Sequence, residues 1–256
     1  MSVRLGFMVL GFVRLGFVRL GFVGQGRFTV GTGSKACNVP SALANRRTAE
    51  TMPDKPDENI ADIVIHTVLN DGMPVCIRTV NADDEARMRD GIAQMSERSR
   101  YLRFFSGFVT PPDRVIDSLL DVDGDMHIAW GAILTDHPEK LAIGAVHAIR
   151  SGQDDDHAEF SVAVLDDYQG LGLSRLLTAT LLINCRLAGM ETLDVQTLSE
   201  NRAAISLVKS LGGQRSGTQS VTSDFQLDIK TAIVALHDEK DTPGLARVLA
   251  AFGNFD

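Results

Sequence analysis

One short junction constrains the fold of this chain more than any other feature. Residues 157–165 read HAEFSVAVL, and their side chains alternate between apolar and polar or small, as in a strand with one buried face. DDYQGLGLS follows this segment, and leucines then recur at helical spacing from Leu173 to Leu187, until Gly189 ends the pattern. Glycines between a strand and a helix leave backbone N–H groups accessible at the positive end of the helix, which suits a phosphate. The junction therefore predicts a site for a phosphate-bearing cofactor.

The composition is that of an ordinary globular protein. The 256 residues are 44% hydrophobic and 23% charged, which fits one substantial domain. The formal net charge of −8 argues against general binding to nucleic acid and is compatible with a cationic substrate. The three cysteines are far apart and form no CxxC pair, so neither a disulfide framework nor a metal site is expected. This cysteine usage predicts a reducing, cytoplasmic location, and Cys185 fits an apolar helical pattern as a packing residue.

The chain opens with a pentapeptide repeat, VRLGF, MVLGF, VRLGF, VRLGF. A period of five gives neither a helix nor a strand a continuous apolar side. Arg14 and Arg19 interrupt the apolar run that a signal peptide or a membrane helix requires, so no membrane association is expected. The later GTGSKA lacks the GK[ST] ending of a phosphate loop. We interpret residues 1–72 as a low-complexity repeat followed by a linker, and we expect this segment to be disordered.

From residue 73 onward, strand patterns and helix patterns are clear. Strand-like runs occupy residues 74–80, 126–135, 140–150, 157–165, 192–198, 214–222 and 225–236. Helical patterns run from Asp83 to about Ser96, over 113–122, from Leu173 to Gly189, from Asn201 to Gly212, and briefly after Pro243. Short turns join the second, third and fourth strands, which predicts an antiparallel meander followed by one strand–helix–strand unit. We expect a mixed α/β domain at residues 73–238 and a short helical tail at 239–256.

A dinucleotide-binding site is one interpretation of the glycine turn. Gly170 and Gly172 follow a strand and open a helix, and Asp194 lies about twenty residues further on, where an acid could bind a ribose. Arg175, however, stands where the third glycine should allow close contact between helix and sheet. The preceding strand also alternates, whereas a central parallel strand should be apolar on both sides. These details argue against the dinucleotide interpretation.

A different pattern, Q-x-x-G-x-[G/A], fits Gln169 and Gly172, with Ser174 in the last small position. Downstream, NRAAISLVKSLGG begins at Asn201, and the two motifs together resemble the GNAT acetyltransferase superfamily over roughly residues 74–236. SERSRYLRFF, HAEFSVAVLDDYQGLG and TLSENRAA are similar, more narrowly, to the acetyltransferase domain of bacterial Pat-type protein lysine acetyltransferases. The resemblance implies an α/β (α+β) fold, with a mixed, mostly antiparallel sheet flanked by helices around a central strand–glycine turn–helix–strand unit.

The resemblance also implies a cofactor and a set of site residues. Acetyl-CoA would be the acyl donor, held by Val162, Val164, Gln169, Gly170, Gly172, Leu173, Ser174 and Asn201. Glu159 would be the general base, and His157, two residues earlier on the same strand face, is a second candidate. A primary amine has a pKa near 10.4, so it must lose a proton before it attacks a thioester, and a carboxylate can accept that proton. No metal is expected in this chemistry.

The resemblance predicts an enzyme that transfers an acetyl group from acetyl-CoA to a primary amine, with a protein lysine as the preferred acceptor. Two alternatives remain open at this point: acetylation of a small-molecule amine, and an acyl-CoA-binding sensor without turnover. Val208 stands where many members carry a tyrosine that protonates the departing thiolate, which keeps the sensor open. Arg175 could contact a phosphate or could be a surface arginine. The expected partners are acetyl-CoA and an acceptor protein or small amine, with no nucleic acid and no membrane.

Overall fold

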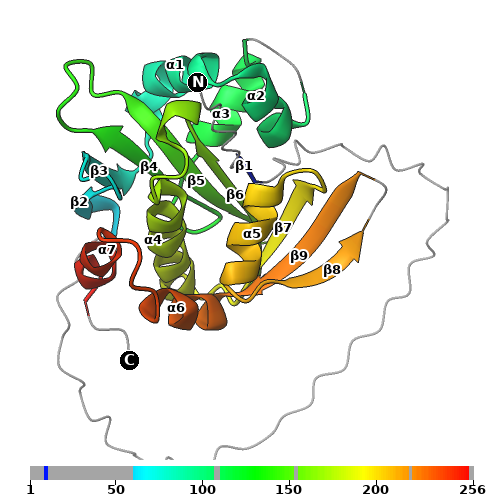
Figure 1. The fold of residues 1–256 in the computed structure, drawn as a ribbon. Coiled ribbons are helices and arrows are strands. Elements are labelled where there is room, and N and C mark those ends of the chain that lie inside the picture. The colour runs from blue at the N-terminus through cyan, green and yellow to red at the C-terminus, as the bar shows by residue number, and fades with distance from the viewer. Residues whose placement is uncertain (1–8, 11–59, 107–109, 153–154, 219–220, 254–256) are drawn as a thin grey trace, which may run out of the picture. The chain divides into compact units, whose positions relative to one another are not determined.

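The computed structural model describes residues 9–10, 60–106, 110–152, 155–218 and 221–253, and Figure 1 shows their fold. The strands are β1 (Val9–Leu10), β2 (Val64–Val68), β3 (Pro74–Thr79), β4 (His127–Leu134), β5 (Ala142–Arg150), β6 (His157–Val164), β7 (Thr192–Leu198), β8 (Gln214–Thr218) and β9 (Thr222–Asp228). The α-helices are α1 (Glu85–Gln94), α2 (Glu97–Phe104), α3 (Asp113–Leu120), α4 (Leu173–Leu187), α5 (Arg202–Ser210), α6 (Ile229–His237) and α7 (Leu245–Ala251).

One mixed sheet runs through the fold in the order β2-β3-β4-β5-β6-β7-β9-β8, and β1 pairs with β6 outside that path. Neighbouring strands from β2 to β6 are antiparallel, and β9 is antiparallel to both β7 and β8. The pair β6 and β7 is parallel, and α4 connects the two strands. The predicted meander and the predicted strand–helix–strand unit are therefore confirmed.

Helices cover both faces of the sheet (Figure 1). A Cβ on Gly144 of β5 would lie 3.2 Å from both Leu173 and Leu177, so this face packs against α4. Val164 is the registered partner of Gly144 on β6 and has its side chain on the same face. On the opposite face, Arg103 of α2 reaches β6. The strand β6 is thus enclosed between α4 and the helices that precede β4.

The folded domain begins earlier than the predicted residue 73. β2 pairs with β3 from Val64 opposite Arg78 onward, and Ile65 is buried in the core. Thr67, also on β2, donates a hydrogen bond from Oγ1 to the carbonyl oxygen of Gly244 at 2.9 Å, which ties the strand to the C-terminal region. The interpretation of residues 60–72 as disordered linker was wrong, because a short edge strand gives only a weak sequence signal. Apart from β1, the rest of residues 1–59 lies outside the described part of the chain.

The C-terminal region differs from its prediction in two ways. The strand predicted at 225–236 ends at Asp228, whose side chain accepts a hydrogen bond from the backbone N–H of Thr231 at 2.7 Å and so begins α6. The predicted tail helix after Pro243 is present as α7, but it is part of the domain, because Leu245 and Val248 are buried in the core. The helix α2 was not predicted as an element.

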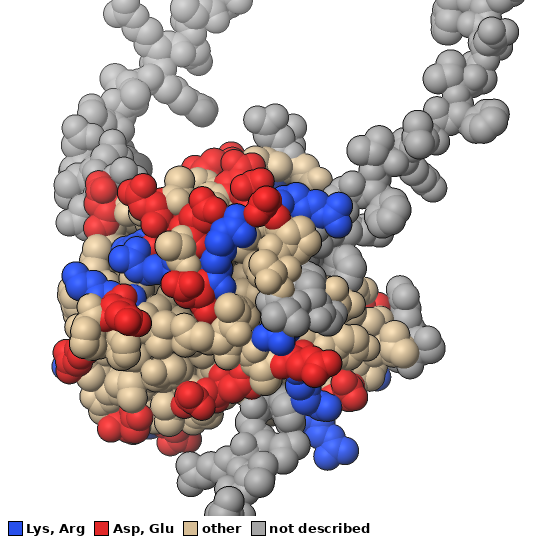
Figure 2. All heavy atoms as spheres, turned by 90° about the horizontal axis from the view of Figure 1, so that it is seen from above, with Lys and Arg blue, Asp and Glu red and all other residues tan. Residues whose placement is uncertain are grey.

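The described residues contain no helix that is long and apolar enough to cross a membrane. Within the same part of the chain, no three His, Cys, Asp or Glu side chains are grouped in a way that could hold a metal ion. Figure 2 shows one face of the molecule, on which acidic and basic side chains are mixed among uncharged ones. Cys185 is fully buried, and burial raises the pKa of its thiol, which fits the predicted packing role.

Candidate active site

The predicted base lies on β6, at the centre of the sheet. Glu159 is half-buried, and its Cα partners are Ile149 on β5 and Asp194 on β7. Because side chains alternate along a strand, Glu159 shares a face with Ser161 and Ala163, opposite the face that packs against α4. This face of β6 therefore carries one carboxylate followed by two small side chains.

The parallel pairing of β6 and β7 ends at Glu159. Within the described residues, the registered pairs run from His157 opposite Thr192 to Glu159 opposite Asp194, and no later pair joins the two strands. Further along, the edge of β6 that faces away from β5 pairs with β1 at Val162. The two parallel strands thus separate beside Glu159, and the edge beyond that point accepts an extended backbone.

Carboxylates and an imidazole lie beside the point where the strands separate. His157 Nδ1 lies 3.2 Å from the Asp194 carboxylate, and His157 Nε2 lies 3.7 Å from the Asp156 carboxylate. Asp194 also accepts a hydrogen bond from Gln226 Nε2 at 3.1 Å. Two carboxylates are therefore close to one imidazole, and Asp194 is also the registered partner of Glu159. Such surroundings favour a cationic group such as an amine substrate.

The glycine turn follows β6 directly in space. Gln169 Nε2 donates a hydrogen bond to the carbonyl oxygen of Val164 at 3.0 Å, while Gln169 Oε1 is buried and has no hydrogen-bond partner in the described structure. Gly170 and Gly172 have φ angles of 75° and 84°, which favour glycine. A Cβ on Gly172 would lie 2.6 Å from Asn70 Oδ1, whereas a Cβ on Gly170 would meet no atom within 4 Å. The turn therefore brings the backbone of Gly172 close to the Asn70 side chain and leaves open space beside Gly170.

Helix α4 begins at this turn without a side-chain cap. Gly172 is its N-cap residue, and Leu173 and Ser174 are buried, at 1% and 8% exposure. A ligand at the turn would therefore meet backbone atoms before side chains. Arg175 forms an ion pair with Glu239 and donates to Ser210 Oγ at 3.2 Å. Of the two interpretations of Arg175, the structure favours the ion-paired surface arginine over the phosphate ligand.

Asn201 caps a helix, in addition to its predicted role in cofactor binding. Its side chain is fully buried and accepts a hydrogen bond from the backbone N–H of Ala204 at 3.2 Å, which caps α5. Its predicted role in holding the cofactor stays a prediction. Val208, in the position where a tyrosine was considered, is also buried, and a Cβ on Gly213 would lie 2.3 Å from its Cγ1 atom.

A buried polar cluster next to Glu159 was missed in the sequence. Arg103 is 2% exposed and donates a hydrogen bond to Ser161 Oγ at 2.9 Å. His147 is the registered partner of Ser161, its Nδ1 lies 3.0 Å from His127 Nε2, and His127 Nδ1 lies 2.8 Å from the carbonyl oxygen of Asp121. Burial lowers the pKa of Arg103 to about 10. Burial also lowers the pKa of His127, and burial together with His127 and Arg103 lowers the pKa of His147 well below its usual value.

The segment SERSRYLRFF forms α2 and the residues next to it. The turn after β6 is hydrogen-bonded to the N-terminal end of this helix. The Asp166 carboxylate accepts hydrogen bonds from the backbone N–H of Ser96 at 3.0 Å, from Ser96 Oγ at 2.8 Å and from Ser99 Oγ at 2.7 Å. Phe104 and Phe105 pack against the core. Asp166 thus joins the helix that carries Arg103 to the strand that carries Glu159.

A parallel strand pair that separates beside a carboxylate, with a glycine turn at the start of the connecting helix, is the arrangement that the resemblance to CoA-dependent N-acetyltransferases predicts. The model of the acetyltransferase (GNAT) family matches residues 97–212. An acetyltransferase of Pseudomonas aeruginosa is 30% identical over 149 residues, which are 57% of this chain and 80% of that protein. The chain belongs to the GNAT acetyltransferase family. The members of this family use acetyl-CoA.

Two further comparisons concern the narrower resemblance and the fold. Acetyltransferase Pat of Mycolicibacterium smegmatis is 28% identical over 137 residues. These residues are 53% of this chain and 40% of that relative, so the chain spans less than half of that relative's length. The crystal structure of the GNAT domain of S. lividans PAT superposes with a TM-score of 0.61 at 22% identity, covering 66% of this chain and 98% of that chain. The predicted Pat-type resemblance and the predicted mixed fold are confirmed.

Proposed function

We propose that this protein transfers the acetyl group of acetyl-CoA to a lysine side chain of an acceptor protein, with Glu159 as the general base. The observation that carries the proposal is the position of Glu159 at the last registered pair of β6 and β7, on the strand that leads to the glycine turn. When bound, acetyl-CoA supplies a reactive thioester. The protein's part is to hold that donor, to admit the amine and to accept its proton.

The donor would be held mainly by backbone groups. Val162 and Val164 are 0% and 1% exposed. Only their backbone atoms can therefore form hydrogen bonds with a ligand that lies along the edge of β6. Beyond the strand, the amides of residues 170–174 stand at the positive end of α4, which favours the phosphates of CoA. Gln169 Oε1, which has no hydrogen-bond partner in the described structure, would accept a hydrogen bond from the bound acetyl-CoA. Because β1 pairs with Val162 and Ala163, a donor along this edge would take the place of β1.

The amine would arrive as an ammonium ion and lose a proton at Glu159. A lysine ammonium has a pKa near 10.4, so deprotonation is required before attack. Glu159 accepts that proton directly or through one water molecule. Asp194 and Asp156 lie at the same end of β6 and attract the cation. The small side chain of Ala163 leaves space along this face for the reacting groups.

The experiment is to incubate labelled acetyl-CoA with the protein and a desalted cell extract supplemented with common amines. Macromolecules are then separated from small molecules, and label is counted in each fraction. Glu159→Gln is run in parallel, and Glu139→Gln, the same exchange on an exposed turn, is the matched control. Label in the protein fraction that is lost only in Glu159→Gln supports the proposal. Label only in small molecules indicates a metabolite amine as acceptor, and no label in either fraction indicates an acyl-CoA sensor.

A further inference from the structure

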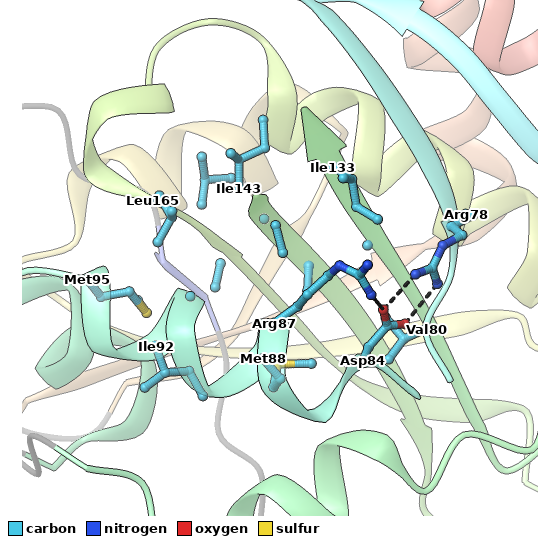
Figure 3. Close-up of a pocket in the computed structure, with 17 residues that line it drawn as sticks. Arg78, Val80, Asp84, Arg87, Met88, Ile92, Met95, Ile133, Ile143 and Leu165 are labelled. Carbon is cyan, nitrogen blue, oxygen red and sulfur yellow. Dashed lines mark hydrogen bonds and ion pairs between the residues drawn. The ribbon is translucent and has the colours of Figure 1, made fainter. Parts of the chain in front are cut away.

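An apolar pocket lies between α1 and the sheet, next to the end of β6 (Figure 3). The part of it that a water-sized sphere can enter has a volume of about 80 Å³. Met88 and Ile92 on α1, with Met95 directly after the helix, form one wall. Ile133, Ile143 and Leu165 line the opposite side. About 10–15 Å³ of such volume holds one water-sized group, so the single methyl of an acetyl group would leave most of this space unused. The pocket is therefore larger than the proposed acetyl transfer requires.

The floor of the pocket is a row of small residues that crosses the sheet. Gly131 on β4, Ala145 on β5 and Ala163 on β6 are consecutive registered partners, and all three line the pocket. On the helix side, Gly91 also lines it, and a Cβ there would lie 3.6 Å from the Ala142 carbonyl oxygen, an ordinary contact. A larger side chain at any of these positions on the sheet would project into the pocket.

One end of the pocket reaches the strand that is proposed to hold the donor. Ala163 and Val164 line the pocket and also belong to the part of β6 whose outer edge would bind CoA. The preceding residue on the same face, Ser161, is covered by Arg103. An acyl chain that extends from the edge of β6 over this face would therefore first meet open space at Ala163.

The other end of the pocket is lined by an ion pair. Both terminal nitrogens of Arg78 contact the Asp84 carboxylate, at 2.8 and 2.6 Å, and Arg87 Nη1 lies 3.2 Å from it (Figure 3). Arg78 is the registered partner of Gly131, so the ion pair continues the row of small residues. Three interstrand spacings separate β6 from β3, a span of roughly 14 Å. The pocket is thus an apolar channel of limited length with a charged end.

We propose that this pocket binds the acyl chain of a CoA thioester longer than acetyl, of the straight, uncharged butyryl to octanoyl class. This inference rests on the proposed function of the site and names its donor more closely. The transfer step is unchanged: Glu159 receives one proton of the ammonium ion, the amide C–N bond forms and the thioester C–S bond breaks. The second proton of the attacking nitrogen passes to the departing sulfur, so CoA leaves as the thiol. Burying each further methylene in the channel should raise affinity roughly fourfold, until the chain reaches the ion pair.

The test measures the affinities of CoA, acetyl-CoA, butyryl-CoA, hexanoyl-CoA and octanoyl-CoA by titration calorimetry. Wild-type protein is compared with Ala145→Leu, which fills the channel from the floor, and with Gly91→Leu, which fills it from the helix. Ala93→Leu is the matched control, because Ala93 is an exposed residue of α1 that does not line the pocket. Circular dichroism establishes that each variant is folded, and the two filling variants serve as checks on each other.

The wild type and Ala93→Leu should bind hexanoyl-CoA at least tenfold more tightly than acetyl-CoA. Both filling variants should lose this gain and bind CoA and acetyl-CoA as the wild type does. Equal affinity for all thioesters in the wild type, or a gain that survives both filling variants, would overturn the inference. The same samples are assayed for acyl transfer to an amine. Absence of transfer with every thioester contradicts the proposed function. In that case, a gain in affinity for longer thioesters that both filling variants abolish still supports the inference that the pocket binds an acyl chain.

Discussion

The two faces of β6 share one backbone and differ in every other respect. On the face against α4, Phe160, Val162 and Val164 are at most 2% exposed and belong to the main hydrophobic core. On the other face, Glu159 and the small residues after it lie beside a polar cluster and an apolar channel. The alternation of a strand therefore separates stability from chemistry within eight residues. Substitutions on the two faces should have effects that can be measured independently.

The largest expected effect on stability comes from the α4 face. Phe160→Ala removes a fully enclosed ring and should lower the free energy of unfolding by about 3–5 kcal/mol. Glu159→Gln, on the adjacent residue, conserves shape and should change it by less than about 1 kcal/mol. Urea denaturation of both variants measures the contrast. Similar losses in the two variants would break the distinction between the faces.

A smaller effect is expected at the turn that ends β6. Gly172→Ala places a side chain at positive φ and within 2.6 Å of Asn70 Oδ1, so it should cost about 1–3 kcal/mol of unfolding free energy. Gly170→Ala is the matched control, because it has the same backbone strain and no neighbouring atom within 4 Å. Combining Asn70→Ala with Gly172→Ala should bring the cost down to that of Gly170→Ala. Equal costs for the two single glycine variants would show that the contact with Asn70 is unimportant.

The smallest effect per residue concerns pH and the polar cluster. Burial lowers the pKa of His127 and of His147 in the folded protein, so the unfolded chain binds more protons once the pH falls below about 6.5. Stability should therefore fall as the pH decreases from 7.5 to 5.5, by at most about 1.4 kcal/mol per pH unit for each histidine. Urea midpoints at several pH values measure the slope, and His147→Gln should reduce it. An unchanged slope in this variant would mean that His147 is not titrating as proposed.

Local patterns in the sequence predicted the part of the site that lies along β6. The alternation of residues 157–165 and the glycines after them are contiguous, so their geometry depends little on the rest of the chain. Both were confirmed, β6 as a strand and Gly170 and Gly172 with positive φ at the start of α4. Near the C-terminus a local cue was overlooked, since Asp228 caps α6 within a run that looks strand-like.

The rest of the site depends on contacts between distant segments. Arg103, His127 and His147 lie on α2, β4 and β5, and they form one cluster with Ser161 only after the register of the sheet is fixed. The channel under α1 likewise needs three small residues to fall opposite one another on three strands. Nothing in the spacing of these residues along the chain indicates that they meet.

The measurement that tests the central claim most directly is the single-turnover rate of acetyl transfer by the wild type and by Glu159→Gln, with CoA affinity measured on the same samples. If Glu159 is the base, the rate should fall by about 10²–10⁴-fold in the variant, while CoA affinity and the rate of the Glu139→Gln control stay at wild-type values. A Glu159→Gln protein that transfers acetyl at the wild-type rate would contradict the assignment of Glu159 as the base.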